Sequence, residues 1–190
     1  MPSRHASAGM NLANKISLVR ILLVPGIVAA LLYYHPERDW LRLLAFGLFV
    51  IGMATDAVDG FIARSQQHPS QLGTLLDPIA DKLLILSTLI SCSLIKGLPG
   101  WMRIPAWFNL IVISRDVIVV IGSVVMLMIL GRWNVRPSRL GKWATFTQML
   151  VIPIVLLKLS ALKLPLLAAA AVLTVCSAIG YIRLGVRDLT

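Results

Sequence analysis

Four aspartates stand within a stretch of the chain that otherwise has the composition of membrane-spanning helices. They are half of the eight acidic residues, and they fall within the 26 positions from 56 to 81, at Asp56, Asp59, Asp77 and Asp81. A carboxylate inside a bilayer costs about 2.5–3.5 kcal/mol on insertion scales, so acids in such positions are expected to serve a function. The hypothesis is that these carboxylates bind metal ions.

The spacing of the aspartates places them on two helix faces. Residues three or four apart on a helix share a face, with Cβ atoms about 5–6 Å apart. Carboxylates supply hard oxygen ligands, and small residues leave room for a substrate and for close helix approach. One predicted stripe therefore holds Asp56, Asp59, Gly60 and Ala63, and the other holds Gly73, Asp77, Ala80 and Asp81. A turn of eight residues, 65–72, is expected to bring the two stripes face to face.

Four carboxylates in one place would repel one another, and divalent cations would relieve that repulsion. Two metals about 3.5–4 Å apart, held by carboxylates, are a recurrent device for phosphoryl displacement. Arg64 and Lys82 flank the stripes, and an arginine is suited to bidentate phosphate contacts. Two simpler interpretations stay open: Asp77 before Pro78 could be a helix N-cap, and Asp56 and Asp59 could be partners in structural ion pairs.

The helices that must position these residues are predicted from long apolar runs. Apolar residues make up 58% of the 190 residues and charged residues 14%, which is typical of a multi-spanning membrane protein. We predict one domain, residues 1–190, that begins with a short polar segment, 1–10. The fold class is predicted to be all-α, an integral membrane protein with six transmembrane helices at about 18–34, 41–63, 72–95, 104–130, 143–162 and 164–182.

The positions of the basic residues predict the topology. With six spans both termini lie on one side, and twelve of the 18 Lys and Arg residues fall on that side. The other side collects Arg38, Arg42, Lys96, Arg103, Lys158 and Lys163. The excess predicts that both termini and a polar cavity holding the aspartates face the cytoplasm, in the cell (inner) membrane. The net charge of +10 is attributed to topology and anionic lipids, and no nucleic-acid partner is expected.

The aspartate stretch resembles the signature of the CDP-alcohol phosphotransferase family. That signature reads D-x2-D-G-x2-A-R-x8-G-x3-D-x3-D, and every specified position matches. The matching residues are Asp56, Asp59, Gly60, Ala63, Arg64, Gly73, Asp77 and Asp81. Eight fixed residues at fixed spacing make a highly specific match.

Two further segments are similar to the bacterial phosphatidylglycerophosphate synthases of this family. The first is the run from Asn14 through Ser17 to Arg20, followed by Pro25, although Ala13 stands where a proline is usual. The second is the run 137–148, PSRLGKWATFTQ, before the fifth helix. Together with the aspartate stretch, these segments cover most of residues 11–150.

The resemblance implies a six-helix, homodimeric membrane enzyme that transfers the phosphatidyl group of CDP-diacylglycerol to an alcohol and releases CMP. It implies that Asp56, Asp59, Asp77 and Asp81 hold two divalent cations, Mg²⁺ or Mn²⁺. It also implies that Asp81 is the general base. The implied contacts to the CDP-lipid come from Gly60, Ala63, Arg64, Ser70 and Gly73.

The acceptor alcohol depends on residues outside the signature. Arg115, Arg139 and Lys142 are expected at the cytoplasmic side, where they would suit the phosphate of sn-glycerol 3-phosphate and give phosphatidylglycerophosphate. Each could instead be a topology-setting cation that contacts lipid phosphates. The tripeptide 114–116, Ser-Arg-Asp, resembles the cardiolipin synthases of the family, so phosphatidylglycerol is the rival acceptor.

Two other classes of protein fit the positions of the acids less well than a transferase does. An ion or proton transporter would use the four acids as a relay, but it would need acids along a path across the bilayer, and here they cluster at one end of two helices. A non-catalytic membrane scaffold would leave the spacing of the eight residues unexplained. The transferase hypothesis accounts for both observations.

Overall fold

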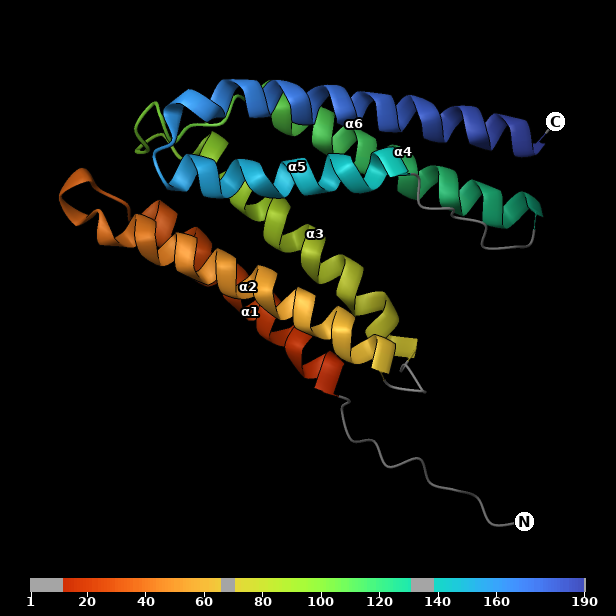
Figure 1. Cartoon of the computed structure of the whole chain (residues 1–190), viewed down its shortest axis with the longest axis horizontal. Coiled ribbons are helices and arrows are strands. Elements are labelled where there is room, and N and C mark those ends of the chain that lie inside the picture. Colours follow the sequence, from red (N-terminus) through yellow and green to blue (C-terminus); the bar gives the residue numbers. More distant parts are fainter. Residues whose placement is uncertain (1–11, 66–70, 131–138, 190) are drawn as a thin grey trace, which may run out of the picture.

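The structure of the chain is a computed structural model, and it describes residues 12–65, 71–130 and 139–189. Within these ranges, side chains are described except at 12–16, 56–65, 71–78, 127, 130, 186, 188 and 189. The described chain is all-helical, which confirms the predicted fold class at that level (Figure 1). Its elements are α1 Leu12–Leu32, a short 3-10 helix η1 Pro36–Arg38, α2 Trp40–Ser65, α3 Gln71–Leu94, α4 Ala106–Leu130, α5 Arg139–Leu156 and α6 Ser160–Leu189.

The described residues form six α-helices in the predicted order, while their crossing of a membrane stays a prediction. The boundaries of α2, α3 and α4 agree within four residues, but α1 begins at Leu12 and α6 ends at Leu189, both beyond the predicted ends. The break between the last two helices was misplaced, because α5 ends at Leu156 and α6 begins at Ser160. The cause is Lys158, whose φ of 63° is the left-handed conformation that ends a helix. Pro165 lies inside α6.

The helices pack as two groups that meet along α3. Helix α1 packs against both α2 and α3, while α6 packs against α5 and α4, and α3 contacts α4 and α5. Apolar side chains from all six helices and their connections form one core, which includes Ile27, Phe49, Leu89, Phe108 and Ile152. Because α1 packs against both α2 and α3, it contacts the two helices that carry the aspartates.

Close approach between helices depends on glycine at two positions. A Cβ atom at Gly122 of α4 would lie 2.7 Å from the Tyr181 ring of α6, and the neighbouring Ser123 hydroxyl lies 2.9 Å from the Tyr181 hydroxyl. A Cβ atom at Gly52 of α2 would lie 2.7 Å from a methyl group of Leu84 on α3. A larger residue at either place would have to move its neighbour.

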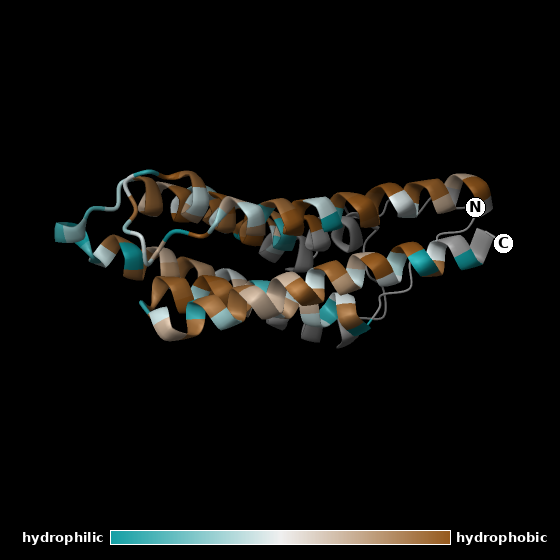
Figure 2. Cartoon of the chain, turned by 90° about the horizontal axis from the view of Figure 1, so that it is seen from above, coloured by the Kyte–Doolittle hydropathy of each residue, from teal (hydrophilic) through white to brown (hydrophobic). Residues whose placement is uncertain are grey.

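The helices run back and forth, so the molecule has two ends (Figures 1 and 2). We call the "turn end" the one formed by the connections 33–39, 95–105 and 157–159. The opposite end is called the "site end"; there α2 ends and α3 begins. The start of α1 and the end of α6 also lie at the site end. This alternation is the one expected of an even number of helices.

The turn end is held together by charged side chains from distant parts of the chain. Asp39 pairs with Arg42, at 2.7 Å, and with Lys158, at 3.1 Å. Arg42 also donates a hydrogen bond to the Leu156 carbonyl, and the Lys158 ammonium lies 5.2 Å from the centre of the Trp101 ring. Three connections are thereby tied together, because each supplies a partner to the same cluster.

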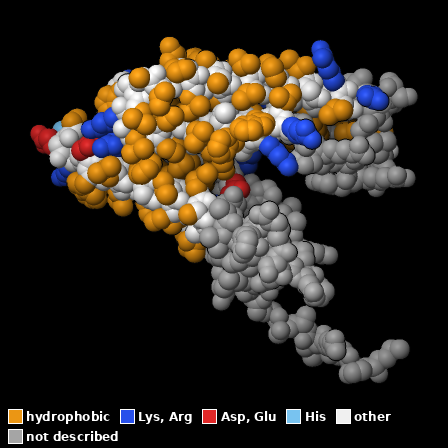
Figure 3. All heavy atoms as spheres, viewed as in Figure 1, with side chains coloured by type: hydrophobic (Ala, Val, Ile, Leu, Met, Phe, Trp, Pro, Cys, Tyr) orange, Lys and Arg blue, Asp and Glu red, His pale blue; other side chains and the backbone are white. Residues whose placement is uncertain are grey.

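Apolar side chains cover the long flanks of the helices (Figure 3). Several are more than two-thirds exposed, among them Leu22, Met128 and Leu164. Two described segments, Ala106–Met126 and Ser160–Gly185, are long and apolar enough to cross a membrane, and shorter apolar helices lie at Ser17–Leu32 and Trp40–Thr55. Exposed apolar surface of this extent indicates an apolar surrounding.

Candidate active site

The aspartates lie where α2 ends and α3 begins. Helix α2 carries Asp56 and Asp59 in its last three turns, and helix α3 carries Asp77 and Asp81 in its first three turns. Both segments are helical, so the predicted spacing of three and four residues does place each pair on one helix face. The two helices contact each other and both contact α1.

Asp81 is the one of the four aspartates whose side chain is described, and it makes an ion pair that the sequence did not predict. Its Oδ1 accepts a hydrogen bond of 2.5 Å from Nη1 of Arg20, on α1. The Arg20 side chain is fully buried, whereas the Asp81 side chain is 27% exposed. A buried guanidinium is strongly unfavourable without an anionic partner, so Asp81 and Arg20 stabilise each other.

From the sequence, Arg20 was identified as part of the segment from Asn14 to Arg20 that resembles the phosphatidylglycerophosphate synthases, but no partner was predicted for it. The signal that could have identified it is the polar pair Ser17 and Arg20, three residues apart on an otherwise apolar helix and both fully buried. Polar residues that share one face of an apolar helix point to a partner on a neighbouring helix. The neighbour, α3, could not be identified from that pattern alone.

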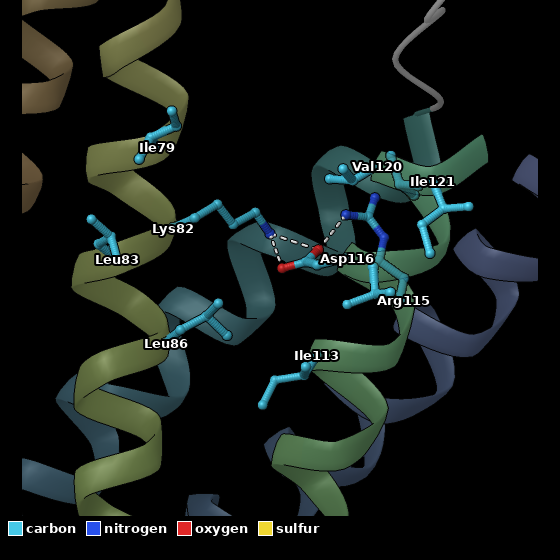
Figure 4. Close-up of a pocket in the computed structure, with 11 residues that line it drawn as sticks. Ile79, Lys82, Leu83, Leu86, Ile113, Arg115, Asp116, Val120 and Ile121 are labelled. Atoms are coloured by element: carbon cyan, nitrogen blue, oxygen red, sulfur yellow. Dashed lines mark hydrogen bonds and ion pairs between the residues drawn. The ribbon is translucent and has the colours of Figure 1, made fainter. Parts of the chain in front are cut away.

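A second charged cluster joins α3 to α4 immediately beside Asp81. Lys82 donates to both carboxylate oxygens of Asp116, at 2.6 and 2.8 Å, and Arg115 donates to the same carboxylate at 2.8 Å (Figure 4). Arg115 also donates to the Ser177 hydroxyl of α6, at 3.2 Å. Its Nε is buried and has no hydrogen-bond partner within the described part of the chain. Asp116 is thus shared by two cations.

Lys82, Arg115 and Asp116 also border a pocket between α3 and α4, whose exposed lining is almost wholly apolar. The pocket has a volume of about 550 Å³. Apart from Lys82, Arg115 and Asp116, it is lined by apolar side chains, which Figure 4 shows coming from α3 and α4. A pocket with apolar walls and a few convergent charges suits a ligand that carries an anionic group.

The structure brings together some of the predicted site residues and leaves others apart. Arg115 joins Lys82 through Asp116, beside Asp81 in the sequence. Arg139 and Lys142 lie in the first turn of α5, are exposed, and make no hydrogen bond or ion pair to any described residue. The structure describes only the backbone at Gly60, Ala63, Arg64 and Gly73. Ser70 lies outside the described residues.

The prediction of a metal site stays a prediction. No group of three or more acidic, histidine or cysteine side chains gathers among the described residues, but Asp56, Asp59 and Asp77 are not among them. The donor set itself fits Mg²⁺ or Mn²⁺, because four carboxylates supply only hard oxygen ligands. Asp81, partly exposed at a helix face, is accessible to such a cation.

Comparison with known proteins supplies the family. A family model described as CDP-alcohol phosphatidyltransferase matches residues 10–176. The chain belongs to this family. The match extends from the start of α1 into α6, so it takes in the aspartates as well as Arg20 and Arg115, and the predicted resemblance is confirmed.

Relatives within the family are named for two activities, phosphatidylglycerophosphate synthesis and cardiolipin synthesis. A protein of Mycobacterium tuberculosis H37Rv, named "Probable phosphatidylglycerophosphate synthase", is 33% identical over 94% of this chain and 83% of its own length. A Haemophilus influenzae protein named "CDP-diacylglycerol--glycerol-3-phosphate 3-phosphatidyltransferase" is 30% identical over 94% of this chain and 95% of its own length. A rice protein named "Cardiolipin synthase (CMP-forming)" is 28% identical over 77% of this chain and 46% of its own length.

Proposed function

We propose that this chain transfers the phosphatidyl group of CDP-diacylglycerol to sn-glycerol 3-phosphate, forming phosphatidylglycerophosphate and CMP. The observation that carries the proposal is the eight-residue signature, placed on the ends of two helices that meet at the site end. Relatives whose names specify this reaction align over nearly the whole chain.

In the proposed reaction the acceptor hydroxyl oxygen bonds to the phosphorus that carries the diacylglycerol. The bond from that phosphorus to the oxygen it shares with the CMP phosphate breaks, and CMP leaves with the electron pair. Asp81 takes the proton of the hydroxyl, because a carboxylate beside the attacking oxygen is a suitable general base. Arg20 holds this carboxylate from α1.

Two divalent cations, Mg²⁺ or Mn²⁺, would be held by Asp56, Asp59, Asp77 and Asp81. When bound, they would neutralise the charge that develops on the diphosphate oxygens. The nucleotide end of the donor would meet Gly60, Ala63, Arg64, Ser70 and Gly73. Small residues in this set would let the diphosphate approach the backbone, and Arg64 would contact its oxygens.

The acceptor phosphate would bind at the pocket between α3 and α4. Arg115 is the first choice for this contact, because its buried Nε has no partner among the described residues. Lys82 shares Asp116 with Arg115, so a phosphate dianion would compete with Asp116 for both cations. Arg139 and Lys142, exposed at the start of α5, would attract the phosphate from solvent.

Phosphatidylglycerol is the second candidate acceptor, which would make the chain a cardiolipin synthase. The apolar walls of the same pocket, supplied by residues such as Ile79, Leu83 and Val120, could hold part of a lipid acceptor. The rice relative named cardiolipin synthase is consistent with this choice. The two acceptors differ in the charge that Arg115 would meet, a phosphate monoester in one and a diester in the other.

The proposal includes a placement in the membrane. All six helices would cross the cell (inner) membrane, with both termini and the aspartates at the cytoplasmic side, and the chain would form a homodimer. The excess of basic residues at the site end supports this orientation. The acyl chains of the donor would stay in lipid while glycerol 3-phosphate arrives from the cytoplasm.

The proposal is tested by incubating purified protein with CDP-diacylglycerol and one acceptor at a time. The acceptors are glycerol 3-phosphate, phosphatidylglycerol, inositol phosphate and serine. We expect CMP and phosphatidylglycerophosphate, identified by mass, with glycerol 3-phosphate. Chelation with EDTA should abolish the reaction, and Mg²⁺ or Mn²⁺ should restore it. Formation of cardiolipin as the main product would favour the second acceptor. Uptake of divalent cations into liposomes without CMP release would contradict the transferase.

A further inference from the structure

Arg20 is the most completely buried charged side chain at the site end among the residues described. Its side chain has no exposed surface, yet it comes from α1, a helix that contributes nothing to the family signature in 56–81. It reaches Asp81, on α3, with a hydrogen bond of 2.5 Å. A guanidinium buried this deeply is strongly unfavourable unless its charge is paired.

The contact constrains Asp81 in two ways. A guanidinium is planar and donates in fixed directions, so it restricts the orientation of the carboxylate it binds. The contact also places a permanent positive charge beside a carboxylate that lies four residues after another acid, Asp77, on the same helix. A carboxylate has about four lone-pair sites, so binding to Arg20 leaves capacity for a cation or a substrate proton.

We propose that Arg20 is the positioning residue of Asp81 and its resident counter-ion. It holds the carboxylate in one orientation for proton transfer, and its charge partly substitutes for metal when no cation is bound. Because the Arg20 charge already offsets part of the repulsion between the carboxylates, the fold depends less on bound metal. The same charge also repels an incoming divalent cation. Arg20 acts through Asp81, and it is not assigned a contact with substrate.

The turn end supplies a matched control. Arg42 is also a nearly buried arginine paired with an aspartate, Asp39, but it lies at the opposite end of the molecule. Replacing either arginine by glutamine removes one charge and one ion-pair partner of an aspartate, although Asp39 keeps its pair with Lys158. Loss of stability is therefore common to Arg20→Gln and Arg42→Gln, whereas effects on Asp81 should be confined to the first.

The kinetic readout rests on the proposed function. In Arg20→Gln we expect kcat to fall by about tenfold or more while KM for both substrates stays within about threefold. Arg20→Lys, which keeps the charge, should recover part of the lost kcat. Arg42→Gln should keep the wild-type kcat per folded molecule. Wild-type kcat in Arg20→Gln, or a parallel loss in both glutamine variants, would overturn the proposal.

A second readout does not need the transferase reaction. The rise in Tm caused by Mn²⁺, relative to EDTA, should be larger in Arg20→Gln than in the wild-type protein, because the metal then replaces the missing charge. It should be unchanged in Arg42→Gln. Equal Mn²⁺-induced shifts in Arg20→Gln and the wild type would overturn the proposal, whatever the reaction proves to be. If wild-type protein releases no CMP, the proposed function fails while this test still decides the role of Arg20.

Arg20→Lys guards against misfolding of the glutamine variant. If Arg20→Gln cannot be purified folded, a lowered kcat in Arg20→Lys with unchanged Tm and KM would support positioning, because lysine lacks the rigid planar geometry of the guanidinium. Unchanged kcat in that variant would contradict it.

Discussion

The two ends of the molecule use charged residues in different ways. At the turn end, one acid, Asp39, is shared by Arg42 and Lys158, and with the contact of Lys158 to Trp101 these interactions join three connections of the chain. At the site end, acids recur at helical spacing on α2 and α3, and the described contacts bring in single residues from α1 and α4. The charges of the turn end pair with one another within the fold, whereas the acids of the site end are the ones that we propose to bind metal.

The physical difference lies in spacing and in the supply of partners. A connection can bend until each charge meets its opposite, so the turn end needs no additional ion. A helix fixes the separation of its side chains, and carboxylates three or four residues apart repel one another unless cations are supplied. Arg20 supplies one such charge, and divalent cations would supply the rest.

The largest expected effect comes from exchanging one acid at each end. Asp81→Asn should lower the rate of CMP release by at least about 100-fold, because an amide cannot accept the proton of the acceptor hydroxyl. Asp39→Asn should leave the rate per folded molecule unchanged, since Asp39 lies at the turn end. CMP release undiminished in Asp81→Asn would remove the role assigned to this residue and, with it, the contrast between the ends.

An intermediate effect is expected at the pocket between α3 and α4. Arg115→Gln should raise KM for glycerol 3-phosphate by about tenfold, because a charged hydrogen bond to phosphate contributes about 1.5–3 kcal/mol. KM for CDP-diacylglycerol should change little. The control is Arg103→Gln, which removes an arginine of the turn end whose described contacts are to backbone carbonyls. An equal rise in KM for the two substrates would argue against an acceptor site at Arg115.

The smallest expected effect is a change with pH in the stability that Asp39 contributes at the turn end. The hydrogen bonds donated by Arg42, with Lys158 adding to them, hold the pKa of Asp39 well below its ordinary value of 3.8. A lowered pKa in the folded state gives stability that is present above the ordinary value and lost as the pH falls toward the folded one.

Thermal unfolding in detergent should therefore show wild-type protein more stable than Asp39→Asn near pH 7. The difference should narrow as the pH falls below about 4. A constant difference between the two proteins from pH 7 to pH 3 would show that the Asp39 charge does not stabilise the turn end.

Much of the fold could be predicted from local patterns. Apolar runs predicted six helices in the right order, and the spacing of Asp77 and Asp81 placed both residues on one helix face, as α3 now has them. The boundary at Lys158 could not be predicted, because a left-handed residue other than glycine gives no local signal. The tertiary contacts around Asp39 hold that turn, and those contacts are far apart in sequence.

The candidate site was predicted only in part, for a related reason. Its acids were identified because their spacing repeats within two adjacent helices. The partner of Asp81 was missed because Arg20 lies 61 residues away, and the link from Arg115 to Ser177 spans 62 residues. Ser177 lies in α6, a helix in which the sequence showed no functional signal.

The sequence by itself determined the all-helical class, the grouping of the acids and the family resemblance, since each depends on residue types at short, fixed spacings. The tertiary structure decided which helices supply the remaining charges. Helical periodicity fixes the neighbours of a residue on its own helix, but contacts between helices depend on how they cross and rotate against each other. That arrangement brings Arg20 to Asp81, and Lys82 and Arg115 to Asp116.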